Sequence, residues 1–101
     1  MIKPIDYDRP AMREIRYARR YYGRVRAELA IRFMAAFTDS IRKIERAPQS
    51  FSHHTHGTRI APIRKFRHWI VFVELPQHIL IVALMHSRRR PGYWRRRLPR
   101  P

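Results

Sequence analysis

The chain has 101 residues, enough for one domain with a modest core, and 45% of them are hydrophobic. Its 23 lysines and arginines against seven acids give a formal net charge of +16, which favours an acidic partner or nucleic acid. The absence of cysteine excludes disulfides, zinc thiolate sites and thiolate catalysis. The N-terminus lacks the apolar core of a signal peptide, and the longest apolar run, 79–85, is too short to cross a bilayer. We therefore expect a cytoplasmic protein.

Two helices are predicted after a short edge strand in residues 1–7. Asp8 suits the N-cap of the first helix, Pro10 falls in its first turn, and Gly23 is its predicted end. The second helix spans about 25–47 and ends at Pro48. Apolar residues recur at helical spacing in both: Ala11, Ile15, Ala18 and Tyr22, then Ala30, Phe33, Phe37, Ile41 and Ile44. The short link predicts an antiparallel helical hairpin whose apolar stripes pack in a core.

Residues 48–58 have the composition of a loop. They include three histidines, at 53, 54 and 56, which invite a metal-site interpretation. Zinc needs about four ligands, and no cysteine or acid lies near these histidines in the sequence. We therefore expect an exposed polar loop, with no metal and no cofactor.

The C-terminal half is predicted to form the sheet. Residues 59–67 are expected to be an irregular edge strand with a basic face, interrupted by Pro62. Residues 69–75 and 79–85 form a predicted hairpin around a tight connection. These two strands are apolar without alternation, which indicates a central position with both faces covered. The fold class that follows is α+β, with an N-terminal helical hairpin packed on a small twisted antiparallel β-sheet.

A basic segment, 86–101, ends the chain and contains two runs of three arginines around an aromatic pair. Guanidinium groups bind carboxylates and phosphates in two-pronged fashion, and aromatic rings offer faces for stacking. One interpretation makes this segment an exposed surface that binds an acidic target, with Trp94 as the anchor. The other folds Trp94 back onto the core and leaves the arginines merely solvated.

Motifs along nearly the whole chain resemble the RelE/ParE toxins of bacterial toxin–antitoxin pairs. The matching features, in chain order, are Ala11 with Glu14-Ile15, Tyr21-Tyr22, Ala30 with Phe33, Ile41 with Ile44 and Pro48, Gly57 with Arg59, the strand 69–72, the strand ending 81–86, and the closing 88–95. The closing stretch resembles the ParE ending of His, Arg, Pro and an aromatic pair. The resemblance implies one toxin domain over 1–101, neutralised by an antitoxin in a hetero-oligomer, with the two-helix and antiparallel-sheet fold.

The resemblance leaves the target open. ParE-like members poison DNA gyrase, and RelE-like members cut messenger RNA in the ribosome. For a binding toxin, the predicted toxic surface is Arg88, Arg89, Arg90, Tyr93, Trp94 and Arg95. The predicted antitoxin-binding residues are Ile15, Tyr22, Phe33, Phe37, Arg59 and Phe66. The antitoxin is expected to supply an acidic amphipathic segment.

RNA cleavage by the 2′-hydroxyl needs a proton acceptor, a proton donor and cations for the developing charge. Arg59, Arg64 and Lys65 are the candidate cations, and His86 is the candidate acid or base. Ser87 stands where a His-Tyr ending would place tyrosine, so the set is incomplete. Gyrase inhibition by binding is therefore the first hypothesis. A ribosome-dependent endonuclease and a non-catalytic nucleic-acid-binding or ribosome-binding protein are the alternatives.

Overall fold

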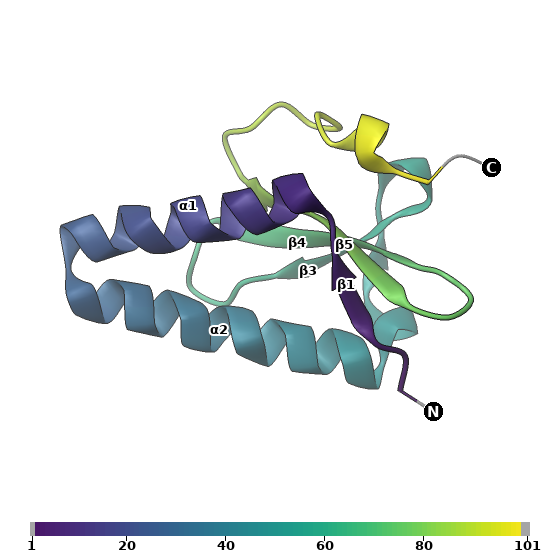
Figure 1. The fold of residues 1–101 in the computed structure, drawn as a ribbon, viewed down its shortest axis with the longest axis horizontal. Coiled ribbons are helices and arrows are strands. Elements are labelled where there is room, and N and C mark those ends of the chain that lie inside the picture. Colours follow the sequence, from purple (N-terminus) through teal and green to yellow (C-terminus); the bar gives the residue numbers. More distant parts are fainter. Residues whose placement is uncertain (1, 100–101) are drawn as a thin grey trace.

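The computed structural model describes residues 2–99; Met1, Arg100 and Pro101 lie outside the described residues. The strands are β1 (Ile5–Tyr7), β2 (Ser52–His53), β3 (Arg59–Pro62), β4 (His68–Glu74) and β5 (Ile79–His86), and they form one sheet in the order β1-β5-β4-β3-β2 (Figure 1). All neighbouring pairs are antiparallel except β1 with β5, which is parallel. The predicted α+β fold is confirmed, with a mixed sheet in place of a purely antiparallel one.

The two helices, α1 (Arg9–Val25) and α2 (Ala27–Arg46), form the predicted hairpin (Figure 1). The single extended residue Arg26 joins them, with φ −161°. The predicted end at Gly23 is wrong, because the helix continues two residues further and closes with Arg26 N–H donating to Tyr22 O at 3.0 Å. A Cβ at Gly23 would meet the Ala30 Cβ at 3.6 Å, an ordinary contact, so this position does not require glycine. No helix in the described part of the chain is long and apolar enough to cross a membrane.

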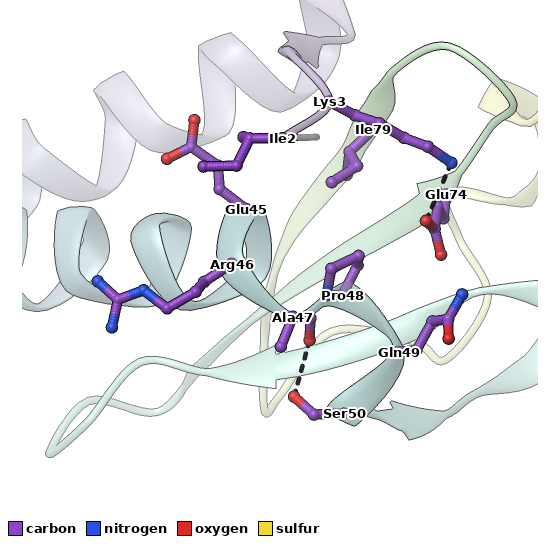
Figure 2. A pocket seen from close by; sticks show the side chains of 10 residues that line it. All are labelled: Ile2, Lys3, Glu45, Arg46, Ala47, Pro48, Gln49, Ser50, Glu74 and Ile79. Carbon is purple, nitrogen blue, oxygen red and sulfur yellow. Dashed lines mark hydrogen bonds and ion pairs between the residues drawn. The ribbon is translucent and has the colours of Figure 1, made fainter.

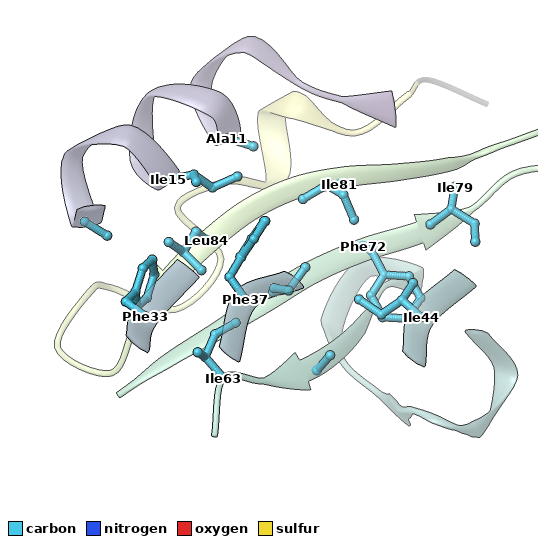
Figure 3. Close-up of a cluster of buried hydrophobic side chains, with 13 residues drawn as sticks. Ala11, Ile15, Phe33, Phe37, Ile44, Ile63, Phe72, Ile79, Ile81 and Leu84 are labelled. Atoms are coloured by element: carbon cyan, nitrogen blue, oxygen red, sulfur yellow. The ribbon is translucent and has the colours of Figure 1, made fainter. Parts of the chain in front are cut away.

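The helices cover one face of the sheet, and the main core lies between the helices and that face (Figure 3). Phe33, Phe37 and Ile44 of α2 and Ala11 and Ile15 of α1 are buried there, as their spacing predicts. They pack against the side chains of Ile70, Phe72, Ile79, Ile81 and Leu84 from the two central strands. The aromatic stripe of the second helix is therefore core packing.

A β-bulge in the central hairpin sets which side chains face which layer. Val71 pairs with Ala83 whereas Phe72 pairs with Ile81, so Val82 is the extra residue of β5. As a result Val82 and Ala83, although consecutive, both pack on the face opposite the helices, and Leu84 returns to the helix face. Both faces of these strands are apolar because both are covered.

The C-terminal segment covers the second face. Trp94 is fully buried there against Val71, Val82 and Ala83, with Leu98 packed beside them. The chain reverses at Pro91-Gly92, where Tyr93 N–H donates to Arg90 O at 3.3 Å and Gly92 has φ +74°. That geometry is typical of a type II turn, which favours proline followed by glycine. The structure therefore supports the interpretation that Trp94 folds back.

Residues 48–58 contain more regular structure than a loop. Two single-turn helices, Pro48–Ser50 and Thr55–Gly57, flank β2, which pairs with β3. The predicted edge strand 59–67 is thus shortened to β3, with β2 outside it, and residues 63–67 form the turn into β4.

Candidate functional site

A groove of about 970 Å³ runs between α1, the adjoining ends of β4 and β5, and the C-terminal segment. Its lining includes five arginines, three tyrosines and two histidines, but a single carboxylate. These residues are Arg13, Arg67, Arg88, Arg89, Arg97, Tyr17, Tyr21, Tyr22, His68, His86 and Glu14. The side chains of Tyr17 and Tyr21 are largely exposed, at 62% and 51%. The groove therefore offers cations and aromatic rings rather than a large apolar surface.

Glu14 of α1 joins three parts of the chain. Its Oε1 accepts hydrogen bonds from Leu84 N–H at 3.1 Å and from Arg97 Nη1 at 2.9 Å. Its Oε2 accepts from the Tyr93 hydroxyl at 2.7 Å and from Arg97 Nη2 at 3.1 Å. The carboxylate and the guanidinium thus form a two-pronged ion pair whose side chains are only 16% and 18% exposed. We call these four residues the Glu14 network.

The same network provides hydrogen-bond partners for backbone groups along the outer edge of β5. β1 ends at Tyr7 opposite Ile81, so the strand has no neighbour on that side beyond this point among the described residues. Arg97 Nη1 donates to Val82 O at 3.1 Å, and Glu14 accepts from Leu84 N–H. Burial, followed by the bond to Glu14, raises the pKa of Tyr93, so its hydroxyl stays protonated and donates. Side chains therefore replace a strand along this edge.

Two histidines meet at the floor of the groove. His68 and His86 are paired across β4 and β5, and their ring centroids lie 4.9 Å apart in an edge arrangement. His68 Nε2 is hydrogen-bonded to the Tyr22 hydroxyl at 3.1 Å. Burial, followed by the neighbouring His86, lowers the pKa of His68 to about 4, so His68 is neutral at physiological pH. Nδ1 of His86 accepts from Arg88 N–H at 3.0 Å, which leaves Nε2 as the donor of the neutral ring.

The predicted toxic surface separates into exposed and buried residues. Arg88, Arg89 and Arg90 follow β5 and are exposed, and so is Arg95. Trp94 is fully buried, so it is not an exposed anchor in this conformation. Tyr93 is half-buried within the Glu14 network and carries the Arg89 guanidinium 4.0 Å from its ring centroid.

The four residues considered for RNA cleavage do not line one groove. His86 lines the groove, whereas Arg59, Arg64 and Lys65 are absent from its lining. Arg59 is paired with Phe72, far along β4 from the His68–His86 pair, and its Nη1 donates to Phe51 O at 2.7 Å. Arg67 is the cation that the β3–β4 turn contributes to the groove.

Most of the residues predicted to bind an antitoxin belong to the interior. Ile15, Phe33 and Phe37 are buried in the main core. Tyr22 and Phe66 are half-buried with ring centroids 5.0 Å apart, and Tyr22 lines the groove. Free apolar contact area on the helices comes instead from Tyr17, Tyr21, Val25 and Ile31, which are 51–70% exposed.

Sequence reasoning missed the groove roles of His68, Arg67 and Arg97. The pairing of His68 with His86 depends on the bulge in β5, which shifts the register of the hairpin. One signal was available for Glu14. Glu14 is the only acid between Asp8 and Glu28 and lies among the arginines of an otherwise basic helix.

A second, smaller hollow of about 370 Å³ lies near the N-terminus (Figure 2). Its lining includes the ion pair between Lys3 Nζ and Glu74 Oε2 at 3.0 Å, and Lys3 also donates to Leu75 O. The Ser50 hydroxyl, also in the lining, donates to Ala47 O at 2.7 Å. The polar groups of Lys3, Glu74 and Ser50 already have hydrogen-bond partners within the chain, so we assign them a structural role.

Comparison with known proteins identifies the fold. No protein-family model matches the sequence, and the search of curated proteins found no match either. Among solved structures, the chain is similar to one described as a chromosomal ParDE TA system from P. aeruginosa, with a TM-score of 0.73. That alignment covers 84% of this chain and 96% of the other, at 11% identity. The similarity therefore establishes a ParE-like fold.

Proposed function

We propose that this chain is the toxin of a type II toxin–antitoxin module, which inhibits DNA gyrase by binding and is neutralised by an acidic antitoxin. Two findings support the proposal: the fold similarity to a chain of a ParDE system, and the motifs shared with ParE-like toxins. The observation that carries it is the run Arg88–Arg90, which is exposed directly after a central strand.

These arginines are exposed, and Arg89 also contacts the Tyr93 ring within the chain. None of the three lies within ion-pair distance of a carboxylate in the part of the chain that the structure describes. Adjacent guanidinium groups repel one another weakly in water, and an acidic target replaces this repulsion with attraction. The proposed target surface is therefore Arg88, Arg89, Arg90 and Arg95, without Trp94.

The helical hairpin is the proposed antitoxin surface. Val25 and Ile31 near its tip are 57% and 70% exposed, and the surrounding surface is rich in arginine. An amphipathic acidic segment fits this combination because apolar anchors bury while salt bridges form at the rim. Neutralising part of the +16 charge would also relieve the self-repulsion of the free protein.

Growth inhibition tests the proposed target surface. We expect Arg88→Ser/Arg89→Ser/Arg90→Ser to abolish toxicity while thermal stability and antitoxin capture persist. The matched control replaces Arg16, Arg19 and Arg20 with serine, since these are also exposed and the charge change is the same. Equal loss of toxicity in both variants would show that total charge, not this surface, determines the effect.

A gyrase supercoiling assay beside a ribosome-programmed RNA cleavage assay tests the target. The proposal expects inhibition of supercoiling before any depletion of messenger RNA. Cleavage in the ribosomal A site without an effect on gyrase would reverse this order. His86→Ala would then be the first variant to make, with an expected rate loss of about 10²–10⁴-fold for a general acid or base.

A further inference from the structure

The groove beside α1 has a large excess of positive charge. Arg97 is already paired with Glu14, the only carboxylate of the lining. The four remaining arginines, at 13, 67, 88 and 89, have no carboxylate within ion-pair distance among residues 2–99. They come from three different parts of the chain that the fold brings to one groove: α1, the turn before β4, and the segment after β5. A ligand of this groove must therefore carry several negative charges.

Flat aromatic faces accompany these charges. Tyr17 and Tyr21 line the groove one helical turn apart, and both are more than half exposed. Positions i and i+4 of a helix share a face and are about 6 Å apart along its axis. Exposed tyrosine rings on a basic helix are suited to stacking with planar rings.

We propose that this groove binds a single strand of nucleic acid, with the phosphates on Arg13, Arg67, Arg88 and Arg89 and the bases stacked on Tyr17 and Tyr21. Cationic grooves with aromatic platforms bind single strands in this way and with little dependence on sequence. The backbone of Arg88 is held against His86, because Arg88 N–H donates to His86 Nδ1 at 3.0 Å.

An acidic peptide is a poorer match for the groove. An amphipathic peptide needs apolar pockets for its anchors. The aliphatic lining is limited to Pro10, Ala18 and Leu84, and the last is only 4% exposed. The exposed area is instead made of guanidinium groups and rings, which is the combination that phosphates and bases require.

The proposal does not depend on an effect on gyrase or on cleavage of the bound strand. It concerns direct binding by the purified chain. Arg88 and Arg89 belong to both surfaces, whereas Arg13, Tyr17, Tyr21 and Arg67 lie outside the proposed gyrase-binding surface.

Fluorescence anisotropy with the full-length protein and labelled dT10 or U10 oligonucleotides tests the proposal. The logarithm of the dissociation constant should rise with the logarithm of salt concentration with a slope of about 3, because each phosphate contact contributes about 0.7. Arg13→Ser/Arg67→Ser should lower this slope by about 1.4. The control Arg19→Ser/Arg42→Ser makes the same charge change at exposed positions outside the groove and should leave the slope nearly unchanged.

The tyrosines give an independent readout. Tyr17→Ala/Tyr21→Ala should weaken binding by about 5- to 150-fold per lost stacking contact without changing the salt slope, and Tyr17→Phe/Tyr21→Phe should retain the affinity. Comparison of dT10 with U10 distinguishes DNA from RNA as the strand, and binding of either supports the groove.

Three results would overturn the proposal. The first is an alanine variant that binds as tightly as the unaltered protein. The second is a control arginine variant that loses as much affinity as the groove variant, which would indicate nonspecific attraction. The third is a polyglutamate peptide that binds as tightly as the oligonucleotides and responds to the same substitutions, which would assign the groove to acidic peptides.

Discussion

Removal of the Glu14 carboxylate is expected to be one of the most destabilising single changes outside the apolar core. Glu14→Ala deletes acceptors for Arg97, Tyr93 and the Leu84 amide, four hydrogen bonds in all. The guanidinium of Arg97 then remains largely buried, at 18% exposure, without its counter-ion. Breaking a buried ion pair in this way costs about 3–5 kcal/mol. Because a domain is stable by only about 5–15 kcal/mol, much of the folding free energy would be lost.

Glu28→Ala is the matched control. It raises the net charge by the same one unit, and Glu28 also forms ion pairs, with Arg26 at 3.4 Å and Arg32 at 3.7 Å. The side chains of Glu28 and its two partners are 57–64% exposed, and exposed pairs contribute about 1 kcal/mol or less. The two variants therefore separate burial from charge.

Urea unfolding followed by circular dichroism measures the two free energies of unfolding. We expect Glu14→Ala to lose several times more than Glu28→Ala. The double variant Glu14→Leu/Arg97→Met should regain part of the loss, since it removes both charges together. If Glu14→Ala and Glu28→Ala differed by less than about 1 kcal/mol, the network would not anchor the C-terminal segment as argued.

Two further predictions concern stability. Trp94→Ala should cost about 3–5 kcal/mol in thermal or urea unfolding because the side chain is fully buried, whereas Tyr17→Ala, at 62% exposure, should stay within about 0.5 kcal/mol; equal effects would contradict the assigned burial of Trp94. The pKa of His68 is lower in the folded chain, at about 4, than its ordinary value of 6.5, so the unfolded chain takes up this proton first and stability should fall as the pH drops from 6.5 to 4. The full loss of stability is about 3 kcal/mol. This loss should be absent in His68→Phe and retained in the control His53→Gln, whose ring is exposed. A pH profile of stability that His68→Phe leaves unchanged would refute the prediction.

Local patterns were sufficient to predict the helices and the central hairpin. The stripes that begin at Ala11 and Ala30 identify both helices, and the two apolar runs on either side of residues 76–78 identify β4 and β5. The lack of alternation in those runs indicated a second covered face. The predicted helices supply a cover for only one face, and after β5 the chain has few large apolar residues other than Trp94 and Leu98. That accounting favours the second of the two interpretations, in which Trp94 folds back onto the sheet.

The histidine pair was beyond such reasoning because it depends on the bulge. Counting outward from the turn, where Glu74 pairs with Ile79, a regular hairpin places His68 opposite Met85. The extra residue at Val82 moves the partner of His68 to His86. No glycine or proline stands at positions 80–84 to indicate this irregularity. A slip of one residue inverts the face of a side chain, so groove residues from two strands cannot be assigned without the register.

The C-terminal segment is both a cover for the sheet and the carrier of the exposed arginines, and its residues divide accordingly. Tyr93, Trp94 and Arg97 are fixed by burial and by the Glu14 network. The exposed arginines lie before and among these fixed residues: 88–90 precede Tyr93, and 95–96 lie between Trp94 and Arg97. Anchors so close in sequence restrict the backbone of the arginines, which lowers the entropy that a partner must overcome on binding. Changes at Glu14 should therefore weaken stability and binding together, whereas changes at Arg88–Arg90 should weaken binding alone.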